Sequence, residues 1–259
     1  MMTEDKPIAK PIIDDATREK MALMFSGEVY LPDDVDGFFD LQAAQRDLQL
    51  ELNATPLTNP KRRTELMQAF FGAAGEGLYL ECPVYANWGC NTYWGERCYA
   101  NFNLTLVDDG EIFIGSHTMI GPNVTLVATG HPVRPDLRYQ GAQYSLPVHI
   151  GENVWIGANV TVLPGGTIGD NAVIGANSLV TKDIPANTVA YGSPCKVIRE
   201  INERDDVYYW RDRQFSERFK LQRAVARKLT PTRRACDFCR NTRGPCRRFH
   251  ARPRRARRR

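Results

Sequence analysis

The sequence lacks any run of about eighteen apolar residues, the length that a membrane-spanning helix requires, so it predicts no transmembrane segment. Residues 1–10 are mixed and partly acidic, without a charged head and an apolar stretch, and they indicate neither a signal peptide nor a transit peptide. Cysteine is too sparse for a disulfide scaffold, and its odd count of seven favours reduced thiols. These shortages argue against an integral membrane protein and a disulfide-rich secreted domain, and we expect a cytoplasmic protein.

Most of the chain also lacks a net positive charge. Residues 233–259 hold twelve arginines and one acid, so they contribute +11 to a formal net charge of +4. Residues 1–232 therefore carry a net charge of −7. An argument for binding to nucleic acid can rest only on the C-terminal tail, because the body of the chain repels a polyanion.

What the sequence has in abundance is a six-residue repeat. An aliphatic residue returns at every sixth position, at Ile150, Ile156, Val162, Ile168, Ile174 and Val180. Glycine follows it at Gly151, Gly157, Gly169 and Gly175, and asparagine comes two residues later at Asn153, Asn159, Asn171 and Asn177. A helix spaces apolar residues by three and four, and a glycine-rich strand region of an α/β fold has no reason to keep this phase. We predict a parallel β-helix whose corners consist of glycine and asparagine, since both accept a positive φ.

The chain around the repeat divides into five parts. We expect a flexible leader at 1–16, a helical region at 17–75, the β-helix at 76–204, a C-terminal helix at 205–230, and an arginine- and cysteine-rich, disordered tail at 231–259. Within the helical region, three helices are predicted, at about 17–27, 38–52 and from Pro60, with Asn59 as the cap of the third. Tyr208, Trp210, Phe215 and Phe219 are expected to let the C-terminal helix pack on the β-helix.

The repeat loses its phase between Leu126 and Ile150, and His131 lies in this interruption. Repeat proteins project a loop where the phase breaks, and such loops often carry function. A histidine can fix one ring nitrogen in a hydrogen bond while the other accepts a proton, which suits a general base. From the residues alone, a surface loop histidine remains the simpler interpretation.

The motifs on either side of His131 resemble one enzyme family. The stretches "NVTLVATGHPVRPDLR" and "YSLPVHIGENVWIGANVTVLPGGTIGDNAVIGA" are similar to galactoside and maltose O-acetyltransferases, and the resemblance covers about residues 17–213. It implies a mainly β fold, a left-handed β-helix of three hexapeptides per turn with a helical cap on its N-terminal side. It also implies a homotrimer with its sites between subunits, acetyl-CoA as the co-substrate without a metal, and His131 as the catalytic base.

The same resemblance implies residues that bind the sugar acceptor. They are Asp33, Asn87, Asn101 and Asp109. Asp34 is an alternative to Asp33 because "YLPDD" carries an insertion relative to the family, and Asn87 stands where the family has serine or aspartate. From the residues alone, Asn101 is equally a turn former and Asp109 a loop carboxylate.

On the donor side, the resemblance implies contacts with coenzyme A through "VTKDIP" and "GSPCKVIREI". The implied residues are Trp155, Ala158, Ala176, Thr181, Lys182, Lys196 and Arg199. A pantetheine arm can lie beside a coil stack and accept main-chain hydrogen bonds, while its phosphates require charged donors. The alternative is that these cations are ordinary solvated surface groups.

The tail carries Cys236, Cys239 and Cys246 with the spacing of half a fungal zinc-cluster domain, and His250 would complete a site for one zinc ion. A disordered basic extension or the remnant of a fusion is the other interpretation.

The main prediction is therefore an acetyl-CoA-dependent O-acetyltransferase acting on a sugar or small glycoside. The alternative is a nucleic-acid-binding protein that uses the basic tail, with the β-helix as a scaffold.

Overall fold

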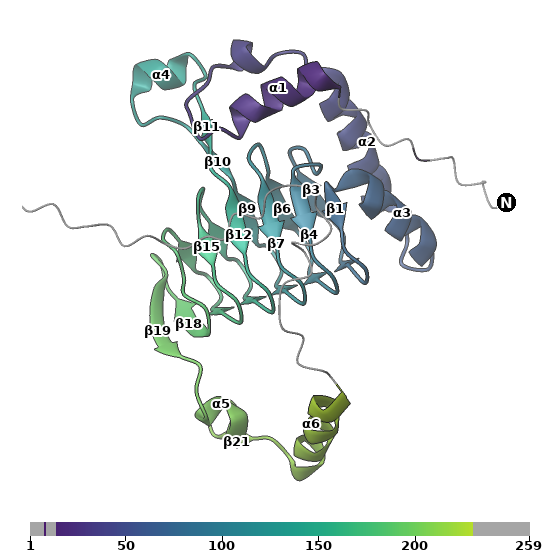
Figure 1. Ribbon diagram of the computed structural model, residues 1–259, viewed down its shortest axis with the longest axis vertical. Coiled ribbons are helices and arrows are strands. Elements are labelled where there is room, and N and C mark those ends of the chain that lie inside the picture. The colour runs from purple at the N-terminus through teal and green to yellow at the C-terminus, as the bar shows by residue number, and fades with distance from the viewer. Residues whose placement is uncertain (1–7, 9–13, 230–259) are drawn as a thin grey trace, which may run out of the picture. The chain divides into compact units, whose positions relative to one another are not determined.

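The computed structural model describes residues 8 and 14–229 of the chain (Figure 1). It separates into two compact units, divided between Glu203 and Arg204. The first unit contains the repeat and the helical region that precedes it. Within the described residues, no helix is long and apolar enough to cross a membrane.

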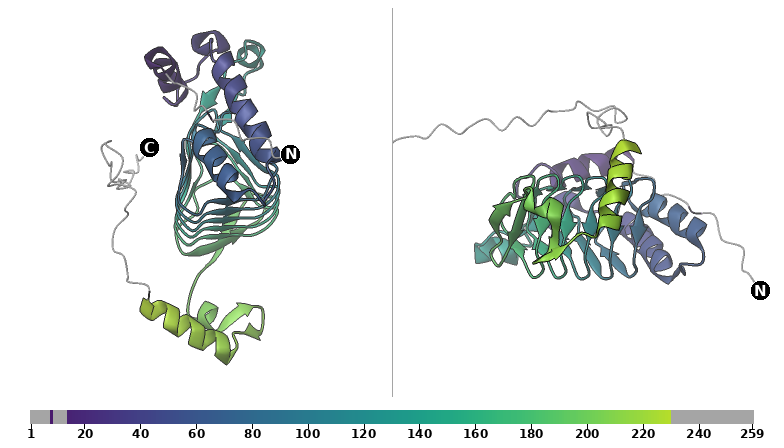
Figure 2. Two further views of the ribbon diagram at one scale, coloured as in Figure 1. Left: turned by 90° about the vertical axis from the view of Figure 1, so that its right-hand side faces the viewer. Right: turned by 90° about the horizontal axis from the view of Figure 1, so that it is seen from below.

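Three long sheets form the body of the first unit. One contains β1 (Ala73–Ala74), β4 (Thr92–Trp94), β7 (Ile112–Ile114), β12 (Val148–Ile150) and β15 (Thr167–Ile168). The second contains β2 (Tyr79–Leu80), β5 (Tyr99–Ala100), β8 (Met119–Ile120), β13 (Trp155–Ile156), β16 (Val173–Ile174), β18 (Thr188–Tyr191) and β19 (Lys196–Glu200). The third contains β3 (Val84–Ala86), β6 (Leu104–Val107), β9 (Thr125–Val127), β14 (Thr161–Val162) and β17 (Leu179–Val180). Apart from the antiparallel β18–β19 pair, their strands are parallel, so the predicted β-helix is confirmed (Figure 2).

The strand register shows how the repeat builds the coil. Ile150 pairs with Ile168 and Ile156 with Ile174, so one turn takes three hexapeptides. Trp94 pairs with Ile114, which is twenty residues further along the chain, so this earlier turn contains two residues more than three hexapeptides. The inward aliphatic residues from Ile150 to Val180 are at most 4% exposed. Burying each such side chain contributes roughly 1.5–3 kcal/mol, so stacked turns gain a core that one turn lacks.

The corners confirm the predicted role of asparagine and correct the predicted role of glycine. The four repeat asparagines have φ between 54° and 59°, as predicted. The four repeat glycines do not have a positive φ; they are required because neighbouring turns approach too closely for a side chain. A Cβ on Gly157 would lie 2.6 Å from the backbone nitrogen of Ala176 in the next turn. Asparagine therefore makes the corner, and glycine allows the turns to stack.

The helical region consists of α1 (Asp15–Met24), the 3-10 helix η1 (Pro32–Val35), α2 (Phe39–Ala54) and α3 (Pro60–Phe70). Asn59 caps α3 as predicted, accepting a hydrogen bond from the Arg62 backbone nitrogen at 3.2 Å. Phe71, at the end of α3, packs edge-on against Trp94 with the ring centroids 5.9 Å apart. Leu48 and Leu52 of α2 join the same core. These helices cover the N-terminal end of the coil (Figure 1).

The interruption between Leu126 and Ile150 projects from the coil as predicted. It contains β10 (Thr129–Gly130), the short helix α4 (Pro135–Tyr139) and β11 (Tyr144–Ser145), and β10 and β11 form an antiparallel pair. We call residues 128–147 the excursion. It lies beside α1 and the segment that follows α1 (Figure 1). An isolated antiparallel bridge joins Tyr30 of that segment to Gln143 of the excursion.

The second unit corrects the prediction of one C-terminal helix over 205–230. It contains α5 (Arg204–Val207), a hairpin of β20 (Tyr208–Trp210) and β21 (Arg213–Gln214), and α6 (Glu217–Leu229). Arg211 adopts a φ of 46°, which turns the chain between the strands. Phe215 stacks on Phe219 at 4.9 Å and contacts Tyr209 at 5.5 Å, so these aromatic residues pack within their own unit.

Candidate active site

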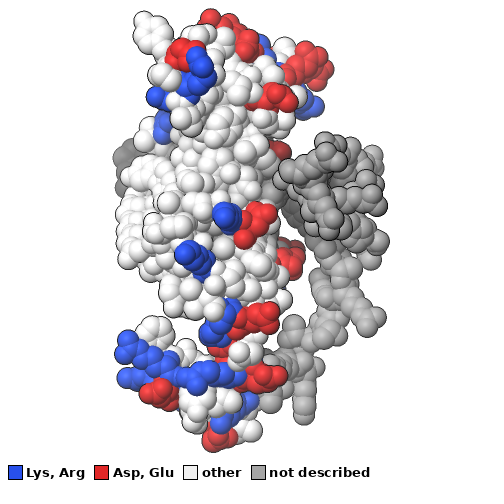
Figure 3. Space-filling view, turned by 90° about the vertical axis from the view of Figure 1, so that its left-hand side faces the viewer, with Lys and Arg blue, Asp and Glu red and all other residues white. Residues whose placement is uncertain are grey.

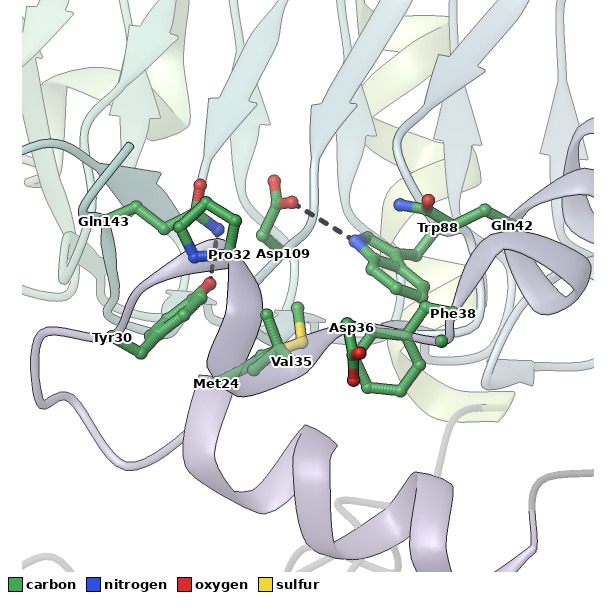
Figure 4. A pocket seen from close by; sticks show the side chains of 11 residues that line it. Met24, Tyr30, Pro32, Val35, Asp36, Phe38, Gln42, Trp88, Asp109 and Gln143 are labelled. Carbon is green, nitrogen blue, oxygen red and sulfur yellow. Dashed lines mark hydrogen bonds between the residues drawn. The ribbon is translucent and has the colours of Figure 1, made fainter. Parts of the chain in front are cut away.

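A pocket of about 360 Å³ lies where the helical region meets the coil (Figure 4). Residues of four separate segments line it: Met24, Tyr30, Pro32, Val35, Asp36, Gly37, Phe38, Gln42, Trp88, Asp109 and Gln143. Trp88 and Phe38 meet edge to face, with their ring centroids 5.2 Å apart. A concave site with aromatic walls and a few polar groups is suited to a ligand with an apolar face and hydroxyl groups at its edge.

Two of the predicted acceptor residues lie together at this pocket. Asn87 donates a hydrogen bond from Nδ2 to Oδ2 of Asp109 at 2.7 Å, and Trp88 donates from Nε1 to Oδ1 of Asp109 at 3.2 Å. Both carboxylate oxygens are thus oriented by one coil corner, and each retains a second lone pair for a ligand hydroxyl. The carboxylate and the indole ring form one preorganised wall.

Asp108 supports this corner and is not among the site residues predicted from the sequence. Its fully buried carboxylate accepts hydrogen bonds from the Trp88 backbone nitrogen at 2.8 Å and from Thr92 Oγ1 at 3.0 Å. Burial raises the pKa of Asp108 to about 7 in spite of these donors. Its only sequence signal is its place beside Asp109, and Trp88 donates to both carboxylates, from its backbone nitrogen to Asp108 and from its indole nitrogen to Asp109.

Replacing Asp108 by asparagine is expected to change how stability depends on pH. The pKa of this carboxyl is raised in the folded state from 3.8 to about 7, so the folded protein binds the proton more tightly. Stability is therefore lost as pH rises through this window. Asparagine does not titrate, so the variant lacks this loss. The difference in free energy of unfolding, variant minus wild type, should therefore be about 2–3 kcal/mol larger at about pH 8 than at about pH 5. Urea unfolding at both pH values measures the gain, and an unchanged difference between the two proteins would contradict it.

The predicted pair Asp33 and Asp34 lies in η1, and the structure separates their roles. Asp34 accepts a hydrogen bond from the Leu31 backbone nitrogen at 2.8 Å, which caps the short helix. Asp33 is exposed and makes no hydrogen bond to any described residue, so it is the one available to a ligand. Neither residue lines the pocket, whereas Asp36, which sequence reasoning missed, does. Lys20 pairs with Asp36 at 2.7 Å and holds the pKa of that carboxyl below its usual range.

Asn101 lies outside the pocket lining, in the turn after β5. Its Oδ1 accepts a hydrogen bond from the Phe102 backbone nitrogen at 2.7 Å, an interaction typical of a turn-forming asparagine. The structure thus places Asn101 in the local geometry of the alternative interpretation, with its side-chain amide group still able to donate.

His131 follows β10, and a backbone carbonyl fixes its ring. Nδ1 lies 2.8 Å from the carbonyl oxygen of Ala142. Because a carbonyl only accepts hydrogen bonds, the neutral ring carries its proton on Nδ1 and presents an unprotonated Nε2. The side chain is exposed and does not line the pocket within this single chain. The geometry fits a general base whose ring is held in one tautomer by a backbone carbonyl.

The predicted donor residues lie along the C-terminal half of the coil. Trp155 is 53% exposed on the outer face of β13, and Ala158 and Ala176 occupy equivalent corners of successive turns. Thr181 and Lys182 follow β17, while Lys196 and Arg199 lie on β19, and all four are exposed. Figure 3 shows this end of the coil, where the few Lys and Arg side chains lie on a largely uncharged surface and some have an acidic side chain beside them. These cations are accessible to an anionic ligand.

Comparison with known proteins assigns the chain to a family. Residues 147–182 match the bacterial transferase hexapeptide (six repeats) model, and residues 23–75 match the maltose acetyltransferase hexapeptide capping motif. The chain is 52% identical over 179 residues to galactoside O-acetyltransferase of Lactococcus lactis, covering 69% of this chain and 86% of that protein. The chain belongs to the galactoside and maltose O-acetyltransferase family. It is therefore an acyltransferase, and its fold is the one that the sequence predicted.

Solved members of this acetyltransferase family share the described architecture. A galactoside acetyltransferase in complex with coenzyme A is 46% identical, with a TM-score of 0.72, over 75% of this chain and 96% of that chain. A hexapeptide-repeat acetyltransferase of Vibrio cholerae complexed with acetyl coenzyme A is 28% identical, with a TM-score of 0.65, over 71% of this chain and 98% of that chain. Cys236, Cys239, Cys246 and His250, which the sequence leaves open as a zinc site or part of a basic extension, lie outside the described residues.

Proposed function

We propose that this acetyltransferase transfers the acetyl group of acetyl-CoA to a hydroxyl of a sugar or small glycoside, with His131 as the general base. The observation that carries the proposal is the hydrogen bond between His131 Nδ1 and the Ala142 carbonyl, which leaves Nε2 as a proton acceptor. The family's solved complexes with coenzyme A and acetyl coenzyme A support the donor, and relatives named galactoside O-acetyltransferase support the acceptor class.

In the proposed reaction, His131 Nε2 takes the proton of the acceptor hydroxyl as that oxygen attacks the thioester carbonyl of acetyl-CoA. The tetrahedral oxyanion is stabilised by a backbone N–H of the coil, for which Ala158 is the candidate. The C–S bond then breaks, and His131 returns the proton to the leaving thiolate. The products are the acetyl ester and coenzyme A, without a covalent enzyme intermediate.

The structure offers no activated thiol for an alternative ping-pong route at Cys98. This residue is 1% exposed and contacts the Gly115 carbonyl oxygen at 3.2 Å. Burial raises the pKa of its thiol, which disfavours the nucleophilic thiolate. Direct transfer between the two substrates is therefore the mechanism to test.

A homotrimer with its sites between neighbouring subunits is part of the proposal. His131 does not line the pocket in one chain, and the outer face of the second sheet exposes Tyr79, Met119 and Trp155 by 45%, 49% and 53%. A neighbouring subunit that covers such a face could complete the site. Sedimentation of the active enzyme tests this point, and an active monomer would contradict it.

The decisive experiment is an acceptor panel read by thiol release from acetyl-CoA. Neutral monosaccharides, thiogalactosides and maltose are compared with a reaction that lacks an acceptor. We expect release above this background for at least one sugar, with the acetyl ester identified by mass. Thiol release that no acceptor increases would refute sugar O-acetylation.

Replacing Lys182 by alanine is expected to raise KM for acetyl-CoA roughly tenfold with little change in kcat, because one charged donor to a phosphate is lost. Steady-state kinetics with varied acetyl-CoA measures the effect. Lys61→Ala is the matched control, since Lys61 is an 89% exposed lysine on α3. An unchanged KM in Lys182→Ala would support the surface-cation interpretation.

A further inference from the structure

The carbonyl that orients His131 lies between two residues held by the N-terminal helical region. Gln143 forms a reciprocal backbone pair with Tyr30, with N–H to oxygen distances of 2.9 and 3.0 Å. Gly141, at a φ of +77°, faces Pro32 so closely that a Cβ would lie 2.9 Å from its Cγ. Ala142 stands between these two contacts and is 1% exposed. The position of its carbonyl oxygen therefore depends on the segment from Tyr30 to Pro32.

The Tyr30 side chain adds two contacts to this backbone pairing with the excursion. Its hydroxyl accepts a hydrogen bond from Nε2 of Gln143 and lies 3.3 Å from Oγ of Ser145. Tyr30 is 2% exposed and Ser145 1%, so the contact between their hydroxyls is buried, while Gln143 is half-buried at the pocket. Four hydrogen bonds, two through the Tyr30 backbone and two through its hydroxyl, thus hold Gln143 and Ser145 of the excursion.

The same residues border the acceptor pocket. Tyr30, Pro32 and Gln143 line it together with Asp109, and Figure 4 shows the Gln143 amide bonded to the Tyr30 hydroxyl. Gln143, which lines the pocket, thus directly follows Ala142, whose carbonyl orients the His131 ring. The helical region contributes to the reaction geometry as well as to the end of the coil.

We propose that Tyr30 is a positioning residue for His131: through Gln143 it holds the Ala142 carbonyl and so maintains the Nδ1–H tautomer with Nε2 free. This inference rests on the proposed role of His131. It assigns no contact with the reacting atoms to Tyr30. Tyr30 acts on His131 only by fixing the position of the Ala142 carbonyl.

The test uses Tyr30→Phe in the full-length chain, which keeps the ring and removes the hydroxyl bonds. With ¹⁵N-labelled histidine, the His131 nitrogen shifts, assigned with His131→Ala, report the tautomer without any substrate. We expect the wild type to show the Nδ1–H form and the variant to move toward the Nε2–H form. We also expect kcat to fall about fivefold, as for one lost net hydrogen bond, with KM for acetyl-CoA unchanged.

Tyr139→Phe is the matched control, because Tyr139 belongs to the same excursion but is 94% exposed. It should leave the His131 shifts and kcat unchanged. Gln143→Ala removes the partner of the hydroxyl and provides the same test if Tyr30→Phe folds poorly. A shifted tautomer in either variant supports the proposal, and unchanged His131 shifts in both folded variants overturn it. Since the spectra need no acceptor, this result is independent of whether the proposed sugar substrate is right.

Discussion

The His131→Ala variant is expected to lose about 10²- to 10⁴-fold in kcat for acetyl transfer, the range typical of removing a positioned general base. Its Nε2 is the group proposed to take the hydroxyl proton, and the Ala142 carbonyl holds the ring in the required tautomer. Acetyl-CoA binding should persist, because no predicted donor contact involves this side chain. Initial rates of thiol release with a saturating acceptor, together with calorimetric titration of acetyl-CoA, separate the two effects.

His117→Asn provides a matched control for His131→Ala. His117 is exposed and occupies a corner at a φ of 63°, where the coil elsewhere uses asparagine. The substitution therefore preserves the corner and removes a histidine, and activity should remain. Full activity in His131→Ala would rule out the proposed mechanism, and equal losses in both variants would point to a general effect on the coil.

The second large effect is expected from Gly115→Ala, which should prevent neighbouring turns from stacking. A Cβ at this position would lie 2.5 Å from the carbonyl carbon and oxygen of Gly151. Both atoms belong to the backbone of the adjacent turn, so no side-chain rotation relieves the contact. We expect a loss of more than about 3 kcal/mol in the free energy of unfolding, at the upper end of overpacking effects.

Thermal and urea unfolding of Gly115→Ala measure this loss, with Glu152→Ala as the control. Glu152 is an exposed corner residue in the turn that Gly115 contacts, and its hydrogen bonds use backbone atoms: its nitrogen donates to Asp170 Oδ1, and its carbonyl accepts from the Asn171 nitrogen. The control should unfold like the wild type. If Gly115→Ala did the same, close contact between turns would not be the reason for glycine at these positions.

The regular part of the fold was predictable because each hexapeptide repeats the same local requirements. The inward aliphatic positions and the asparagine corners follow directly from the period, and the structure confirms both. The reason for glycine was not predictable, since the sequence does not contain the distance between turns. The prediction of one continuous helix over 205–230 was wrong in its first half, where Arg211 at a φ of 46° makes a hairpin turn, whereas a helix is present from Glu217 to Leu229.

The candidate site was predictable only where one local motif carries it. His131 stands in a recognisable interruption, and Asp109 in a motif of the family. Asp36, Trp88 and Gln143 come from three distant segments, and only the folded chain brings them to one pocket. Asp108 has no periodic or motif signal beyond its neighbour, so its burial became visible in the structure alone.

The eighteen-residue turn also limits how such a protein can change its length. Inserting one whole turn preserves every inward position and lengthens the coil by about 4.8 Å, the spacing of adjacent strands. Inserted before the excursion, the extra turn would carry Gln143 away from Tyr30 by that distance and separate the pocket wall. Inserted after Ile150, it would leave both in place. The coil therefore acts as a spacer, and the number of turns before the excursion decides whether Gln143 meets Tyr30.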